Sequence, residues 1–265
     1  MNIHAHPTKK IGVKPRPTHV KTCKLSKYLD LSGFPTPPPA IDWGKKAPNS
    51  TQLFKNDEIG DCAVAGYLHH KEIILQTAGL GINFADPTAV EIYQWATAEE
   101  NGKGYTPDDP NTDTGLVLVN FLEGLRKRGL ILAHAEIDLT NDKEVQVARY
   151  LYGGIYCAFG LPAAAQNMND KWYVPNDNSL GDLSQYSWGG HCVNDKGRLA
   201  NGSSLVTSWG KTIEVTPEFI KKYQTEGHII VHKHTPQAFN SLFVNEAHHH
   251  IALKDLQSDL DALRK

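Results

Sequence analysis

The chain has no long apolar stretch, few cysteines and no marked excess of charge of either sign. None of its apolar runs approaches the about 18 residues that a helix needs to cross a bilayer. Residues 1–7 lack the apolar core of a signal peptide. A formal net charge of −2 gives no reason to expect binding to nucleic acid or to an anionic membrane surface. We therefore expect a cytoplasmic protein, unless it is later incorporated into a larger particle.

The few cysteines are widely spaced and form no Cys-x-x-Cys pair; they are Cys23, Cys62, Cys157 and Cys192. A secreted chain that depends on disulfides carries cysteines at a higher density. We therefore expect four free thiols in a reducing compartment.

Two groups of histidines, His69–His70 and His248–His250, raise the question of a metal site. Adjacent residues on a helix or a strand do not converge on one ion. We expect both groups to be solvated polar residues, and we expect the protein to hold neither a metal nor another cofactor.

The first 40 residues are basic and then rich in proline. This composition is typical of an extended, polyproline-like arm rather than of a packed core. Two interpretations of residues 1–40 remain open. They form either a flexible tail or an arm that docks on a partner or covers the protein's own cleft.

The remaining 225 residues are enough to bury a full core, as one large domain or as two packed lobes. Apolar periodicity predicts helices over residues 61–79, 87–96 and 115–129. Further along, the pattern predicts strands over residues 131–137, 154–159, 191–193, 204–207 and 228–231, with a helix over 142–151. A helical lobe (41–130) before a strand-rich lobe (131–234) indicates an α+β fold. Residues 235–265 are then a C-terminal extension, with a short amphipathic helix over 253–263.

Cys62 is the most informative residue, because it lies where a loop ending in Gly60-Asp61 turns into the first predicted helix. Backbone N–H groups and the helix dipole favour a thiolate at the start of a helix. Asp61 is suited to be the N-cap of this helix, but its charge beside Cys62 opposes thiolate formation. Cys62 is therefore a candidate nucleophile whose reactivity depends on its partners.

Three further fragments occur around Cys62 in a fixed order. Asp42-Trp43 precedes it, Gly190-His191-Cys192-Val193 follows far downstream, and Thr207-Ser208-Trp209-Gly210 comes last. Over about residues 39–230, the four fragments together resemble the papain-like cysteine peptidase family. That family has an Asp-Trp strand at the start of its mature domain, a cysteine at a helix start, a histidine in a strand and an Asn-Ser-Trp-Gly turn. The resemblance implies a two-lobe papain-like fold and a peptide or protein substrate.

The resemblance also implies roles for individual residues. Cys62 would be the nucleophile, and His191 would be the base that carries its proton to the leaving amine. The family's oxyanion donor is a glutamine six residues before the cysteine. That place holds Asn56, or Asp57 if the motifs are aligned on the family's Asn-Gln pair. We favour Asn56, because an anion at this place would repel an oxyanion.

The third catalytic position departs from the family pattern, because Thr207 stands where the family has asparagine. A threonine hydroxyl can accept a hydrogen bond from the histidine, but it has a shorter reach and competing backbone partners. Loss of the orienting group usually weakens such catalysis without abolishing it. Trp209 matches the family's tryptophan that shields this contact from water.

The wider pattern resembles a group of papain-like proteins encoded by bacteriophages and bacteria. Its elements are Asn56-Asp57-x-x-Gly60-Asp61-Cys62, Thr112-Asp113-Thr114-Gly115 and Leu161-Pro162. The first candidate function is a peptidase or amide hydrolase that uses the Cys62–His191 pair. The second is a catalytically weakened papain fold with a structural or binding role, such as a phage capsid or tail decoration anchored by the N-terminal arm. A transglutaminase or cell-wall amidase uses a similar Cys–His order but does not explain Ser208-Trp209-Gly210.

Overall fold

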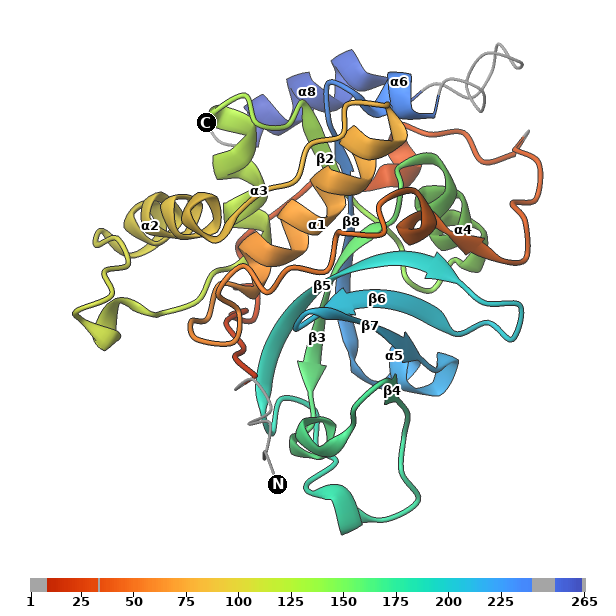
Figure 1. Ribbon diagram of the computed structural model, residues 1–265. Helices are drawn as coiled ribbons and strands as arrows, with labels where there is room; N and C mark the ends of the chain where they lie inside the picture. Colours follow the sequence, from red (N-terminus) through yellow and green to blue (C-terminus); the bar gives the residue numbers. More distant parts are fainter. Residues whose placement is uncertain (1–8, 33, 240–250, 264–265) are drawn as a thin grey trace.

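The computed structural model describes residues 9–32, 34–239 and 251–263. A curved sheet lies at its centre, and helices cover both faces of the sheet (Figure 1). The helices are α1 (Cys62–Thr77), α2 (Asp86–Asn101), α3 (Leu118–Lys127), α4 (Asp142–Leu151), α5 (Pro217–Tyr223), α6 (Thr235–Ala238) and α8 (Leu253–Ala262). The helical part therefore comes first along the chain, as the sequence predicts.

The strands are β1 (Ile41–Asp42), β2 (Ala133–Glu136), β3 (Ile155–Leu161), β4 (Lys171–Trp172), β5 (Gly189–Arg198), β6 (Ser204–Ser208), β7 (Lys211–Val215) and β8 (Gln224–Val231). Their order across the sheet is β2-β8-β3-β5-β6-β7-β4, and β1 pairs with the far end of β5. All neighbours are antiparallel except the short pair β4–β7. The predicted α+β class is confirmed.

The sheet separates two hydrophobic cores, and β3 contributes side chains to both of them. Ile155, Cys157 and Phe159 belong to one core, whereas Tyr156 and Ala158 belong to the other. Successive side chains of a strand point to opposite faces, so an uninterrupted apolar strand supplies both cores. Helices α1, α2 and α3 cover the second core, and Figure 1 shows α1 crossing in front of the sheet.

Helix α1 is buried on nearly all sides, and its apolar residues are accordingly not confined to one face. It ends at Thr77, and Gly79 follows in the left-handed conformation (φ 79°). The N–H of Leu80 then donates to the carbonyl of Leu75 at 2.9 Å, which satisfies one of the last carbonyls of the helix. The predicted start at Cys62 and the predicted glycine stop are both confirmed.

The two terminal segments pack against each other and against the sheet. The apolar side chains of residues 23–34 are buried in the first core; they are Cys23, Leu25, Tyr28, Leu29 and Phe34. Leu256 and Leu260 of α8 are buried in the same core. The Tyr28 hydroxyl donates to Asp259 at 2.6 Å. Residues that the sequence assigns to an arm and to an extension thus contribute to the core that supports β2.

The expectation that His69 and His70 are solvated is wrong, because both are buried in α1. Nδ1 of His70 lies 3.1 Å from Nε2 of His232. Burial lowers the pKa of His70 to about 4, so the ring is neutral at physiological pH. His248–His250 lie outside the described residues. Within the described part of the chain, no group of three or more His, Cys, Asp or Glu side chains is arranged to hold a metal ion.

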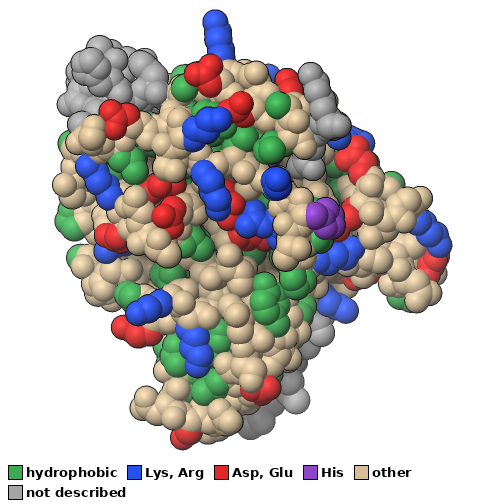
Figure 2. All heavy atoms as spheres, turned by 180° about the vertical axis from the view of Figure 1, so that it is seen from behind, with side chains coloured by type: hydrophobic (Ala, Val, Ile, Leu, Met, Phe, Trp, Pro, Cys, Tyr) green, Lys and Arg blue, Asp and Glu red, His purple; other side chains and the backbone are tan. Residues whose placement is uncertain are grey.

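The surface mixes both signs of charge. On the face shown in Figure 2, Lys and Arg side chains are interspersed with Asp and Glu. Among the described helices, none combines the length and the apolarity that a membrane crossing requires. All four cysteines are buried free thiols, as the sequence predicts.

Candidate active site

Cys62 is the first residue of α1 and is fully buried. Asp113 binds the loop before it at Gly60. The N–H of Gly60 donates to both carboxylate oxygens of Asp113, at 2.9 and 3.1 Å. The Tyr93 hydroxyl donates to the same carboxylate at 2.7 Å and accepts from the N–H of Gly115 at 2.9 Å. This network fixes the turn that places Cys62 at the helix start.

The surroundings of Cys62 do not favour a thiolate in this structure, where residues of the N-terminal arm lie against the site. Burial raises the pKa of the Cys62 thiol to about 12, although the N–H of Cys192, 3.4 Å from Sγ, opposes the rise. Burial also raises the pKa of Asp61 well above its usual range, and the nearby charge of Asp113 adds to this. The charge of Asp61 in turn adds to the raised pKa of Cys62, as the sequence predicts.

His191 lies on β5 and is also fully buried. Its ring stacks on that of Trp209, with 4.1 Å between the ring centroids and 13° between the ring planes. The rings of His191 and Trp172 form a T-shaped pair with 6.3 Å between their centroids. Nε2 of His191 lies 2.7 Å from the hydroxyl of Ser208. Burial, assisted by the charge of Lys9, lowers the pKa of His191 to about 3. In this form the imidazole is neutral.

The hydroxyl that contacts the histidine belongs to Ser208 and not to Thr207. Thr207 is buried on β6, and its hydroxyl has no hydrogen-bond partner among the described residues. The hydroxyl in contact with the imidazole is therefore that of the next residue in the same motif. Nδ1 of His191, the other ring nitrogen, likewise has no hydrogen-bond partner in the described part of the chain.

Asn56 is buried in the loop before Cys62, whereas Asp57 is partly exposed. The side-chain amide of Asn56 donates to the carbonyl of Ile59 at 3.3 Å, so it is bonded within its own loop. The backbone carbonyl of Asn56 accepts from the N–H of Lys10 at 3.2 Å. The loop thus contacts the N-terminal arm beside the candidate nucleophile.

The arm runs between two backbone segments that face each other across the site. The N–H groups of Gly12 and Val13 donate to the carbonyl of Gly190 at 3.2 and 3.0 Å. On the other side, the N–H of Leu116 donates to the carbonyl of Gly12 at 2.7 Å, and the N–H of Lys14 donates to the carbonyl of Leu116 at 2.9 Å. The described part of the arm that contains Lys10 to Lys14 is therefore bound to the protein's own loops beside Cys62.

The arm lies over both candidate catalytic residues. The N–H of Gly12 faces the sulfur of Cys62 and lowers its pKa. The carbonyl of Lys10 accepts from the indole N–H of Trp209 at 3.0 Å. Nζ of Lys9 lies 5.6 Å from the centroid of the same ring. The arm thus contacts both the start of α1 at Cys62 and the tryptophan that stacks on His191.

For the peptide hydrolysis that the sequence motifs predict, we expect Ser208→Ala to lower kcat about five- to tenfold with little change in KM. The lost hydrogen bond to His191 is worth about 1 kcal/mol, and it acts on ring orientation rather than on substrate binding. Thr207→Val is the matched control: it removes a hydroxyl of the same motif that has no partner and should change kcat less than twofold. Steady-state kinetics of the two variants measure the difference. Equal losses in both would show that Ser208 has no special role.

Comparisons with known proteins support the fold. No protein-family model matches the chain, and no curated protein matches its sequence. Among solved structures, it is similar to the cysteine protease and lectin-like domains of Cwp84, a surface layer associated protein of Clostridium difficile. The TM-score is 0.52 at 13% sequence identity, and the match covers 84% of this chain and 55% of the other. The chain thus spans about half the length of the structure that it matches.

This likeness confirms the papain-like fold that the sequence motifs predict, with a helical part followed by an antiparallel sheet. At such low identity the likeness concerns the fold alone. The activity has to be argued from the residues that this chain places in the site.

Proposed function

We propose that the chain is a papain-like cysteine peptidase that uses Cys62 as the nucleophile and His191 as the base. The observation that carries the proposal is the placement of Cys62 at the start of a buried helix beside the strand of His191. Cys192, the residue after His191, donates its N–H to the sulfur of Cys62. Ser208 and Trp209 hold the imidazole from two other directions.

The reaction follows from these groups once a peptide replaces the arm. His191 accepts the thiol proton, and the sulfur of Cys62 attacks the peptide carbonyl carbon. Backbone N–H groups at the start of α1 stabilise the oxyanion, and we assign the supporting donor to Asn56. The imidazolium gives its proton to the leaving amine, which leaves a thioester on Cys62. Water, deprotonated by His191, then hydrolyses the thioester and restores the free thiol.

A weakened papain fold with a structural or binding role is the second candidate function. It is favoured by the absence of an asparagine at the orienting position and by the neutral forms of Cys62 and His191 in the closed structure. A role in a phage particle, reached through the N-terminal arm, belongs to this alternative.

Labelling with a peptide epoxide distinguishes the two functions. We expect the reagent to modify Cys62 selectively, and we expect Cys62→Ala to lose both labelling and peptide hydrolysis. Cys23→Ala is the matched control, since it removes a buried thiol outside the site and should change neither. The labelling is done on the natural chain and on Gly12→Ala. In this variant the new Cβ would clash with the carbonyl oxygen of Gly60 and displace the arm. Absence of selective labelling at Cys62 in both proteins would contradict the peptidase function.

A further inference from the structure

We infer that the cavity between α4, the β5–β6 turn and α5 is a binding site for a small carboxylate with an apolar chain. The cavity has a volume of about 760 Å³, which is within the range of sites for small organic molecules. The described residues that line it are separate from those around Cys62. Binding at this cavity does not depend on the proposed peptidase function.

Apolar side chains enclose the cavity from two sides. In Figure 1 the turn between β5 and β6 lies at the right, with α4 above it and α5 below it. Leu139 and Val145 line the cavity from the side of α4, and Pro217 and Ile220 line it from the side of α5. A Cβ on Gly202, in the turn, would lie no closer than 3.4 Å to the side chain of Pro217. The space between the turn and α5 is therefore open.

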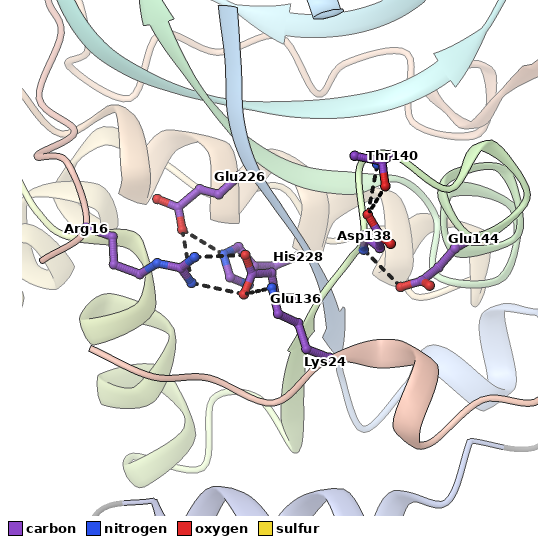
Figure 3. Close-up of polar contacts among 8 residues, drawn as sticks. All are labelled: Arg16, Lys24, Glu136, Asp138, Thr140, Glu144, Glu226 and His228. Carbon is purple, nitrogen blue, oxygen red and sulfur yellow. Dashed lines mark hydrogen bonds and ion pairs between the residues drawn. The ribbon is translucent and has the colours of Figure 1, made fainter. Parts of the chain in front are cut away.

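The loop that leads into α4 holds one wall in place (Figure 3). The N–H of Asp138 donates to Oε1 of Glu144 at 3.0 Å. The N–H and the hydroxyl of Thr140 donate to Oδ1 of Asp138, at 2.9 and 2.6 Å. Leu139 lies between these two residues in the chain, so local hydrogen bonds fix its position. A wall of this kind is already formed before a ligand binds, which lowers the cost of binding.

A buried cation with a free nitrogen lines the same cavity. Arg149 is only 4% exposed. Its Nε and Nη2 donate to Asp195 at 3.1 and 2.7 Å, and Nη2 also donates to the hydroxyl of Ser204 at 3.2 Å. Nη1 makes no hydrogen bond among the described residues. Because a guanidinium group has five N–H donors, Arg149 retains donors for a ligand carboxylate.

Two more cations, Arg198 and Lys221, line the cavity. Among its described lining residues the only acid is Asp142, whose side chain is 77% exposed. Oδ1 of Asp142 lies 3.9 Å from Nη1 of Arg198, which is beyond hydrogen-bond distance. Since Asp195 neutralises Arg149, the two other cations face this single carboxylate. The cavity thus keeps an excess of positive charge, and a ligand carboxylate can take the place of Asp142 at Arg198.

The lining determines the class of ligand. The apolar walls fit a hydrocarbon chain, and the cations fit a carboxylate. A peptide would bring amide groups against the apolar walls, where an unpaired polar group is costly. We therefore assign the site to a monocarboxylate with an unbranched acyl chain, and not to a peptide C-terminus.

Equilibrium dialysis with radiolabelled octanoate, at pH 7.5 and low ionic strength, tests the site. We expect one octanoate to bind per chain. Unlabelled 1-octanol, which has the same chain without the charge, should compete at least about fivefold less well than unlabelled octanoate. Absence of one-to-one binding up to about 1 mM octanoate, or equal competition by 1-octanol, would overturn the inference.

Two variants locate the octanoate. Arg198→Gln and Lys221→Gln should each weaken its binding at least about threefold, because each removes one cation from the lining. Lys222→Gln is the matched control: it changes the adjacent lysine of α5, which is exposed and lies outside the lining, and should leave the affinity unchanged. Natural affinity in both lining variants, or an equal loss in the control, would contradict the assignment.

The same pair of lysines gives a second readout in the natural chain. Acetylation by N-hydroxysuccinimidyl acetate, followed by peptide mass spectrometry, measures the accessibility of each lysine. Octanoate should slow the modification of Lys221 and leave that of Lys222 unchanged. Equal effects on the two lysines would show that octanoate binds elsewhere.

A dipeptide tests the class of ligand. Acetyl-Ala-Leu with a free carboxylate should displace octanoate much less well than decanoate does. Displacement as strong as that by decanoate would assign the cavity to peptide C-termini and overturn the inference.

Discussion

Replacing His191 with alanine is expected to lower peptide hydrolysis by about 10²–10⁴-fold, the range typical of a general base. Cys62 cannot supply a thiolate on its own in the closed form, where burial holds its pKa at about 12. Something must accept the thiol proton when the sulfur attacks, and His191 is the titratable side chain whose strand neighbour, Cys192, contacts that sulfur. The loss should therefore appear in kcat rather than in KM.

The pH dependence provides the decisive readout for His191. Its pKa is lowered to about 3 by burial, and removal of the arm should let the pKa rise towards the ordinary value near 6.5. In Gly12→Ala, the new Cβ would lie 1.7 Å from the carbonyl oxygen of Gly60 and should displace the arm. In this variant, hydrolysis should therefore fall as the pH drops through the pKa of His191. The His191→Ala variant should lack this inflection. The matched control is His19→Ala, an exposed histidine of the arm. A His191→Ala rate within twofold of its parent would refute the assignment.

The sequence predicts the parts of the site that are encoded locally. The start of α1 at Cys62 follows from a glycine loop before an apolar run, and the structure confirms it. Helix α4 has the bounds that the sequence predicts, and in the structure the side chain of Asn141 caps it by accepting from the N–H of Glu144. The place of Trp209 against His191 follows from the order of motifs and is seen in the stacking of the two rings.

The sequence could not predict that the histidine contacts Ser208 rather than Thr207. Neighbouring residues of a strand point to opposite faces, so the choice between them depends on how the strand is placed. Thr207 pairs with Asn194 across the β5–β6 ladder, and Trp209 then turns with a positive φ of 43°. A residue-by-residue comparison with the family's motif gives no information on this geometry.

The place where the arm binds could not be predicted from the sequence either, because the residues that it contacts are distant along the chain. Proline and lysine content predicts an extended segment, but Gly190 and Leu116 give no local sign that they receive it. The short strand β4 was not predicted, because two residues carry no period, whereas the resemblance implied a strand at Asp42-Trp43 and β1 covers Ile41–Asp42. Strand β7 alternates polar and apolar residues over only four positions, and helix α5, which Thr216 caps, has only seven residues.

Replacing Asp195 with asparagine is expected to lower the free energy of unfolding by about 3–5 kcal/mol, the cost of breaking a buried ion pair by removing one partner. Asp195 accepts from Nε and Nη2 of Arg149 at 3.1 and 2.7 Å and from the hydroxyl of Ser204 at 2.9 Å. Both charged side chains are about 5% exposed. Without the carboxylate, the guanidinium of Arg149 would remain buried beside a neutral amide.

The pair joins α4 to β5, where the register shifts between Asp195 and Gly197. Because β5 also carries His191, a looser ladder should reduce hydrolysis as well as stability. Urea unfolding followed by circular dichroism measures the stability. Asp170→Asn is the matched control: its partner Lys211 and the carboxylate itself are solvent-accessible, so the loss should stay below about 1 kcal/mol. If Asp195→Asn costs no more than this control, the pair does not stabilise the strand of His191, and its hydrogen bonds with Arg149 and Ser204 contribute nothing measurable to stability.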